Sequence, residues 1–208
     1  MKIKVCGITG IEQLQALNKW GVDFAGMIFY EGSKRFIGKK LANNKAEIKN
    51  LKIQKVGVFV NEEVEVIEDL VAEYGLDYVQ LHGNESVLFC KEVEAFVPVI
   101  KAIRMGPATK AAEQLEAYKD ACSYFLFDTD SKQYGGTGLQ FDWNALNNLH
   151  ARQPFFLSGG IGSEDVAALR KMDHPQLFAV DVNSRFETEP GVKDLNKVNE
   201  FIKRVHSH

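Results

Sequence analysis

Cysteine is scarce in this sequence, and its few cysteines lie far apart. There are three, Cys6, Cys90 and Cys122, and no two of them form a CxxC pair. An odd number of distant thiols is not typical of a disulfide-stabilised secreted domain, so we expect a reducing, cytoplasmic compartment. Without paired ligands there is no recognisable metal site, and we expect no bound metal.

The sequence also lacks long apolar stretches and blocks of charge of one sign. No uninterrupted apolar run approaches the roughly 20 residues that a membrane-spanning helix needs, and the first residues lack the apolar core of a signal peptide. The net charge is −3, with acidic and basic residues mixed along the chain. A protein that follows a phosphodiester backbone usually concentrates positive charge. We therefore expect neither a membrane nor a nucleic acid as a partner.

What the sequence does contain is a regular alternation of short apolar runs and helical patterns. A chain of 208 residues with 45% hydrophobic residues can bury one substantial core. Eight strand-like runs are each followed by a helical segment, and the runs are mostly continuously apolar, as in a parallel sheet buried on both faces. Eight such units predict an α/β fold, a single (β/α)8 TIM barrel domain over residues 1–208. An open, doubly wound sheet is the alternative, but CGITG in the first turn does not match the GxGxxG of dinucleotide-binding folds.

The expected helices differ in how clearly their boundaries can be recognised. Residues 61–75 predict a strong helix that Asn61 caps and Gly75 ends. Residues 39–50 predict a weak helix, and residues 143–150 predict a short one.

Ionisable and nucleophilic residues recur where the predicted strands end. In a (β/α)8 barrel the active site lies at the carboxyl ends of the strands. The residues that this sequence places there are Cys6, Arg35, Gln80, His82, Lys101, Arg104, Asp128, Asp181 and Asn183. Several also have a structural interpretation: Cys6 as a small buried apolar side chain, His82 as a satisfied core residue, Lys101 in an internal salt bridge. Their convergence on one mouth favours a functional site.

Glycine-rich segments follow two of the predicted strands. SGGIG at 158–162 precedes a helix expected to begin near Ser163, and free backbone N–H groups there could hold an anion. DVNSRFE at 181–187 follows the eighth strand, and the loops after strands seven and eight are the usual phosphate site of such barrels. The alternative is that the glycines only mark where a structural element ends and the next helix begins, without binding a ligand. YGGTG at 134–138 is interpreted as a candidate lid over the mouth.

Taken together, these segments resemble a known enzyme family. KVCGIT, GSKRFI, VGVFVN, VQLHGNE, IKAIR, FDT…YGGTGLQFDW, LSGGI and AVDVNSRFE…PGVKD occur in the order found in phosphoribosylanthranilate isomerases of tryptophan biosynthesis, from about residue 2 to residue 202. The resemblance implies an Amadori rearrangement of N-(5-phosphoribosyl)anthranilate to the 1-deoxyribulose phosphate ketoamine, without a cofactor. The implied partner is this small sugar phosphate, and the implied assembly is a monomer or homodimer.

The resemblance also implies roles for individual residues. Cys6 matches the general base and Asp128 the general acid of the family. Arg35 matches an arginine that contacts the anthranilate, Asp181 an aspartate near the substrate amine, and His82 is placed with these substrate-binding residues. The implied phosphate-binding residues are Gly159, Gly160, Ile161, Ser184 and Arg185. The family often has glycine where Arg185 stands, which leaves the role of that side chain open.

The implied reaction sets requirements on the two catalytic groups. Asp128 must hold a proton near neutral pH to open the sugar ring, which an apolar neighbour such as Phe127 would favour. Cys6 must lose its proton to accept one from C2 of the sugar, and Lys4 or the start of the first helix could stabilise the thiolate. Two other functions remain possible. One is the related indoleglycerol-phosphate synthase, and the other is a non-catalytic sugar-phosphate sensor.

Overall fold

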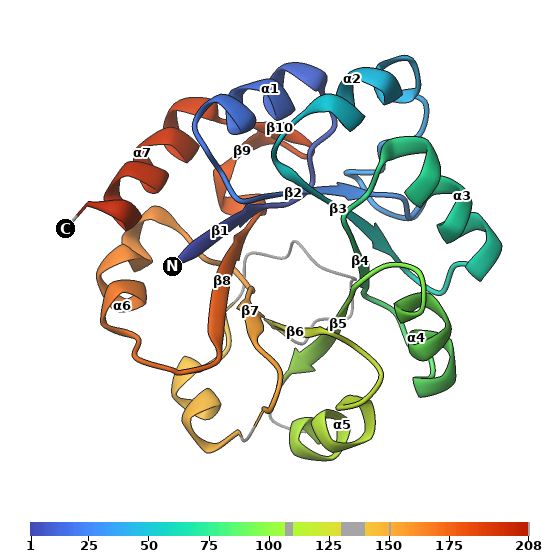
Figure 1. The fold of residues 1–208 in the computed structure, drawn as a ribbon. Helices are drawn as coiled ribbons and strands as arrows, with labels where there is room; N and C mark the ends of the chain where they lie inside the picture. Colours follow the sequence, from blue (N-terminus) through green and yellow to red (C-terminus); the bar gives the residue numbers. More distant parts are fainter. Residues whose placement is uncertain (107–109, 130–139, 150, 208) are drawn as a thin grey trace.

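Eight parallel strands close on one another around a central axis in the computed structural model, which describes residues 1–106, 110–129, 140–149 and 151–207 (Figure 1). The strands are β1 Lys2–Val5, β2 Phe24–Ile28, β3 Gln54–Phe59, β4 Tyr78–Leu81, β5 Val99–Met105, β6 Tyr124–Thr129, β7 Phe155–Leu157 and β8 Leu177–Val182. They pair in sequence order, and β8 returns to β1. The prediction of a closed (β/α)8 barrel is therefore confirmed.

Helices surround the barrel on its outer face (Figure 1). The α-helices are α1 Ile11–Lys19, α2 Lys45–Asn50, α3 Val64–Tyr74, α4 Val87–Glu94, α5 Ala111–Tyr118, α6 Val166–Lys171 and α7 Leu195–His206. Short 3-10 helices are η1 Ala42–Asn44, η2 Trp143–Asn148, η3 Ser163–Asp165 and η4 Ser184–Phe186. The predicted helix at 143–150 is thus a 3-10 helix, and the weak helix at 39–50 is reduced to η1 and α2.

The barrel has two apolar cores, which explains why its strands are so continuously hydrophobic. One core fills the barrel interior and consists of Phe24, Val56, Ile100, Ala102, Leu126, Phe156 and Ala179. The larger core lies between the strands and the surrounding helices. Because successive residues of a strand point to opposite faces, each strand contributes to both cores and needs few polar positions. The polar residues that do interrupt the strands therefore carry information about the site.

The predicted cap of helix α3 is wrong, whereas its predicted end is confirmed. Gly75 follows the helix in the left-handed conformation, with φ of 62°. Asn61 does not cap the helix, which begins at Val64 after an N-cap residue without a side-chain hydrogen bond. Instead Oδ1 of Asn61 accepts a hydrogen bond of 2.7 Å from the backbone N–H of Asn84. The loop after β3 is thereby attached to the loop after β4, a long-range contact that overrides the local capping pattern.

A two-stranded antiparallel ribbon was not predicted. It consists of β9 Glu187–Glu189 and β10 Val192–Lys193, between β8 and α7. Its turn contains Gly191, with φ of 89°, a left-handed conformation that favours glycine. The ribbon lies beside the mouth of the barrel, where its Glu187 contacts Arg35 from the loop after β2.

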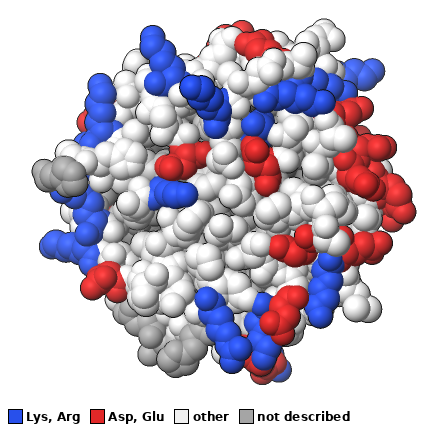
Figure 2. Space-filling model, in the orientation of Figure 1, with Lys and Arg blue, Asp and Glu red and all other residues white. Residues whose placement is uncertain are grey.

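The surface opposite the mouth carries charges of both signs. Figure 2 shows Lys and Arg interspersed with Asp and Glu, with acidic side chains gathered where Figure 1 places α3. In the described parts of the chain, no helix has both the length and the apolar character to cross a lipid bilayer.

Candidate active site

A pocket at the carboxyl ends of the strands gathers most of the predicted site residues. Its lining comprises Cys6, Ile28, Tyr30, Ser33, Arg35, Val58, Val60, Gln80, His82, Asp128, Ser158, Gly159, Gly160, Ile161, Asp181, Asn183 and Ser184. Of the predicted residues, Lys101, Arg104 and Arg185 are not in this lining. The topology accounts for the convergence, because parallel strands of a closed barrel all end at the same rim.

Cys6 lies directly after β1, beside a buried ion pair. Nζ of Lys4 donates to Oδ1 of Asp181 at 3.0 Å, and the two side chains are 0% and 5% exposed. Lys4 stands opposite Asp181 in the register of β1 and β8, so strand pairing itself brings the charges together. The thiol of Cys6 is therefore bordered by a buried ammonium group on its own strand.

The protonation of Cys6 is set by opposing effects. Burial raises the pKa of its thiol, Lys4 and Lys193 lower it, and the charge of Asp181 adds to the rise. Burial alone would lower the pKa of Lys4, but Asp181 and Cys6 raise it overall, which keeps the ammonium charged. Lys4 lowers the pKa of Cys6, as expected. Desolvation outweighs this effect, so the pKa of Cys6 lies above its ordinary value.

Asp128 lies at the end of β6 and is contacted by a histidine from another strand. Nε2 of His82 is 3.3 Å from Oδ2 of Asp128, while Oδ1 of Asp128 accepts from the backbone N–H of Thr129 at 2.9 Å. Nδ1 of His82 is in turn 2.7 Å from Nε2 of Gln80. Gln80 and His82 are two residues apart and so share one face of their strand. Sequence analysis noted Gln80 at a strand end but did not predict that it orients His82.

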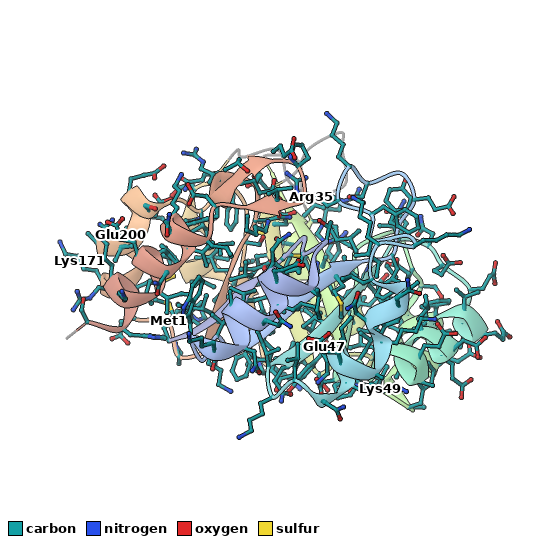
Figure 3. The ribbon with its side chains drawn as sticks, turned by 90° about the horizontal axis from the view of Figure 1, so that it is seen from above. Met1, Arg35, Glu47, Lys49, Lys171 and Glu200 are labelled. Carbon is teal, nitrogen blue, oxygen red and sulfur yellow. The ribbon has the colours of Figure 1, made fainter. Side chains whose placement is uncertain are left out.

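Arg35 reaches the pocket from the loop after β2 and is held by a residue that sequence analysis missed. Its Nε donates to both carboxylate oxygens of Glu187, at 2.9 and 3.0 Å, and its Nη2 donates to Oε2 at 2.6 Å. Figure 3 shows Arg35 on the edge of the barrel away from Met1, near the strands of the ribbon. No local pattern indicates this contact, since 152 residues separate the two partners.

The glycine-rich loop after β7 has the backbone geometry of an anion site. Gly159 and Gly160 have φ of 93° and 64°, in the left-handed region, and a Cβ atom on Gly159 would collide with Oγ1 of Thr129. In the part of the chain that the structure describes, the N–H groups of Gly160 and Ile161 have no protein acceptor. The N–H of Gly162 is already bound by Asp165 at 2.7 Å. The N–H groups of Gly160 and Ile161 are therefore available to an anion, and the predicted phosphate contact stays a prediction.

The remaining predictions have mixed outcomes. The side chain of Arg185 pairs with Glu164 at 2.5 Å on the exposed rim, so a phosphate contact by that side chain stays a prediction. Lys101 pairs with Glu85 at 2.7 Å, which confirms the predicted salt bridge. It does not line the barrel interior, because its strand neighbours Ile100 and Ala102 do so and successive residues of a strand point to opposite faces. The candidate lid at 134–138 lies outside the described residues.

The other thiols and the acidic residues suggest no second reactive centre. Burial raises the pKa of Cys90 to about 11 and that of Cys122 to about 12. These two buried thiols are therefore overwhelmingly protonated at neutral pH. Among the described residues, no group of three or more His, Cys, Asp or Glu side chains is placed to bind a metal ion.

Comparisons with known proteins agree on one family. Residues 3–204 match the family model described as N-(5'-phosphoribosyl)anthranilate (PRA) isomerase. The chain is 40% identical to the N-(5'-phosphoribosyl)anthranilate isomerase of Parabacteroides distasonis, covering 99% of this chain and 93% of that protein. It is 38% identical to the N-(5'-phosphoribosyl)anthranilate isomerase of Thermotoga neapolitana, covering 99% of this chain and 98% of that protein.

Solved structures give the same result. The phosphoribosyl anthranilate isomerase of Thermotoga maritima superimposes with a TM-score of 0.84 at 34% identity, over 99% of this chain and 98% of that one. A second solved structure is a phosphoribosyl anthranilate isomerase in complex with reduced 1-(o-carboxyphenylamino)-1-deoxyribulose 5-phosphate. It superimposes with a TM-score of 0.81 at 32% identity, over 99% of this chain and 98% of that one.

Proposed function

The chain belongs to the N-(5'-phosphoribosyl)anthranilate isomerase family, and from this premise we propose how its pocket performs the family's reaction in tryptophan biosynthesis. The reaction converts N-(5-phosphoribosyl)anthranilate to 1-(2-carboxyphenylamino)-1-deoxyribulose 5-phosphate. The observation that carries the proposal is that Cys6 and Asp128 line one pocket from β1 and β6. An acid and a base on different strands can act on different atoms of one sugar.

Asp128 begins the reaction by donating a proton to the ring oxygen. The C1–O bond then breaks, and the nitrogen lone pair forms the C1=N bond of an open-chain iminium. Asp128 becomes a carboxylate, and the N–H of His82 is within reach to stabilise it. The contact of His82 with Asp128 therefore supports the carboxylate that this step leaves behind, while the role of Asp128 as the acid is inferred from its place in the pocket.

Cys6 then removes the proton from C2, which the adjacent iminium has made acidic. The electrons of the broken C–H bond form a C1=C2 bond and neutralise the nitrogen, giving an enolamine that tautomerises to the ketone. Cys6 ends as a thiol and Asp128 as a carboxylate, so one proton must return from sulfur to oxygen. Exchange with water after product release can close the cycle, with one proton lost from the thiol and one gained by the carboxylate.

The substrate's two anionic ends have separate places in the pocket. The N–H groups of Gly160 and Ile161, together with Gly159 and Ser184, are suited to the phosphate. Arg35, with its guanidinium oriented by Glu187, is suited to the anthranilate carboxylate. Asp181 lines the same pocket, and we assign it to the substrate amine. No metal or organic cofactor is required by any step.

The proposal extends to the protein's setting. Three free, buried cysteines support a reducing, cytoplasmic compartment. We assign residues 1–208 to one barrel domain that acts as a monomer or a homodimer, since a neighbour from Thermotoga maritima is described as dimeric.

The decisive experiment follows the fluorescence of freshly prepared phosphoribosylanthranilate. We expect the purified protein to accelerate its disappearance and to yield the ketoamine. Binding without turnover would indicate a sugar-phosphate sensor. Conversion of the ketoamine to an indole would indicate an indoleglycerol-phosphate synthase. Either result would contradict the proposal.

A further inference from the structure

A buried cluster of charges formed by Arg35, Glu187 and Lys193 joins the ribbon to the rim of the pocket. We propose that Glu187, itself held by Lys193, is the positioning residue that fixes the guanidinium of Arg35 for the substrate's aromatic carboxylate. This inference rests on the proposed function and adds to it a residue outside the pocket lining.

Glu187 uses both carboxylate oxygens, and its side chain is only 4% exposed. Oε1 accepts from Nε of Arg35 at 2.9 Å, from the N–H of Gly191 at 3.1 Å and from Nζ of Lys193 at 2.7 Å. Oε2 accepts from Nε and Nη2 of Arg35, at 3.0 and 2.6 Å. Because Gly191 and Lys193 belong to the ribbon, Glu187 is itself held firmly before it orients Arg35.

The binding mode leaves one edge of the guanidinium unoccupied by Glu187. Glu187 occupies the edge formed by Nε and Nη2, and a guanidinium is planar with five N–H groups. The opposite edge, formed by Nη1 and the second N–H of Nη2, matches the geometry of a carboxylate. Arg35 lines the pocket, so this edge is available to a ligand there.

The stem of Arg35 is guided by a glycine. A Cβ atom built on Gly7 would lie 2.7 Å from Cδ of Arg35 and 2.6 Å from Oδ1 of Asn183. Asn183 is bound in turn by Nζ of Lys193 at 2.7 Å. The loops after β1, β2 and β8 therefore meet at one point, and the absence of a side chain at position 7 lets Arg35 cross the end of β1.

The charge of the cluster favours an anion. Arg35 and Lys193 supply two positive charges and Glu187 one negative charge, which leaves one positive charge uncompensated. The side chain of Lys193 is fully buried, so the free edge of Arg35 is the part of the cluster that reaches the pocket. A carboxylate is the expected partner, whereas the phosphate has the separate glycine-rich loop after β7.

A Glu187→Gln variant separates positioning from simple charge. The substitution makes the cluster more positive, so charge alone would strengthen the binding of an anionic ligand. If Glu187 acts by orienting Arg35, binding weakens instead. We expect the Kd of the reduced product analogue, which carries the anthranilate carboxylate, to rise about tenfold. We expect the inhibition constant of inorganic phosphate to change by less than about twofold, because phosphate binds elsewhere.

Glu189→Gln is the matched control. Glu189 belongs to the same ribbon and is exposed, so the same change of charge is made without touching Arg35. We expect both constants to remain at their original values in this variant. An unchanged or lower Kd of the analogue in Glu187→Gln would overturn the inference, and so would an equal rise in Glu189→Gln.

A double variant tests whether Glu187 acts through Arg35. In Arg35→Ala/Glu187→Gln we expect the analogue to bind no more weakly than in Arg35→Ala alone. If the double variant raises the Kd of the analogue by the product of the two single effects, Glu187 acts independently of Arg35. That result would contradict the inference while leaving the proposed function intact. An unchanged Kd in Arg35→Ala would remove the carboxylate site from the proposed function and the inference with it. Cooperative unfolding of each variant well above the temperature of the assay would show that a global loss of folding is not the cause.

Discussion

His82 and Asp128 meet across the pocket, with Nε2 of the histidine 3.3 Å from Oδ2 of the carboxylate. His82 directly follows β4 and Asp128 belongs to β6, and β5 separates these two strands in the barrel. Since Nδ1 of His82 contacts the amide of Gln80, the ring is held at both nitrogens. Asp128 is therefore presented to the substrate with one oxygen bound by His82 and the other by a backbone N–H.

Replacing Asp128 by asparagine removes the transferable proton and retains the shape of the side chain. We expect kcat to fall by about 100- to 10,000-fold, with KM within about threefold of its original value. Loss of substrate fluorescence measures both. Asp173→Asn, at an exposed position outside the pocket, is the control and keeps full activity. Normal turnover in Asp128→Asn would remove Asp128 as the acid.

Cys6→Ser replaces the proposed base by a hydroxyl group that ionises far less readily. We expect a loss of kcat of about 100-fold or more, with substrate affinity retained. Cys122→Ser is the matched control, because Cys122 lies outside the pocket and its sulfur donates to the backbone carbonyl of Tyr118, as a hydroxyl can also do. Near-normal kcat in Cys6→Ser, measured by the same assay, would reject the base assignment.

Lys4→Met tests how the thiolate of Cys6 is stabilised. Burial raises the pKa of Cys6, and the positive charge of Lys4 opposes that rise, so removing the charge should raise the pKa further. The base acts as a thiolate, so kcat/KM increases with pH, and the midpoint of that increase should move to higher pH in the variant.

A readout that does not depend on turnover is the alkylation rate of Cys6 by iodoacetamide as a function of pH, with Cys90 and Cys122 replaced by serine. We expect the same upward displacement of the midpoint there. Identical pH profiles with and without Lys4 would contradict the proposed electrostatic role.

Gly7→Ala tests whether the crowded end of β1 sets the position of Arg35. An added methyl group would approach Cδ of Arg35 to 2.7 Å, and φ of 75° also disfavours alanine. We expect about 1–2 kcal/mol of destabilisation from the backbone and a rise in KM from displacement of Arg35. Gly21→Ala is the matched control, since φ is 71° there and nothing lies within 4 Å of the added atom. It should show the loss of stability without the rise in KM.

Glu85→Gln tests the buried ion pair between Glu85, in the loop after β4, and Lys101 of β5. The two side chains are 1% and 4% exposed, so the change leaves a buried ammonium without its counter-charge. We expect the free energy of unfolding to fall by about 3–5 kcal/mol at neutral pH, measured by urea denaturation. Glu113→Gln breaks an exposed pair with Lys110 and should cost less than about 1 kcal/mol.

The same variant should change the response to acid. Burial alone would raise the pKa of Glu85, but Lys101 and backbone hydrogen bonds lower it overall. Stability from a lowered folded-state pKa is present above the unfolded value of about 4.3 and is lost as pH falls through the folded-state pKa. The difference in stability between the original protein and Glu85→Gln should therefore shrink below about pH 4. A constant difference would show that the charge of Glu85 is not the cause.

The sequence by itself was sufficient to predict the barrel and most of the polar residues that line the pocket. Strands buried on both faces produce continuous apolar runs, so their number and order can be counted along the chain, and the polar residues that end them stand out. Cys6, Asp128 and the glycines at 159–160 could be identified this way, since each lies at or directly after a strand end. The roles of these residues remain predictions, and the experiments above test them.

Only the tertiary structure decided which of these residues touch one another. Glu187 and Arg35 are 152 residues apart, and Asn61 and Asn84 are 23 apart, so neither contact leaves a periodic or local pattern in the sequence. The pKa of Cys6 likewise depends on burial and on charges contributed by three different strands, β1, β8 and β10. Strand formation follows from short-range patterns of side chains, whereas the balance of charges at a buried site arises only after barrel closure has removed water and set the distances.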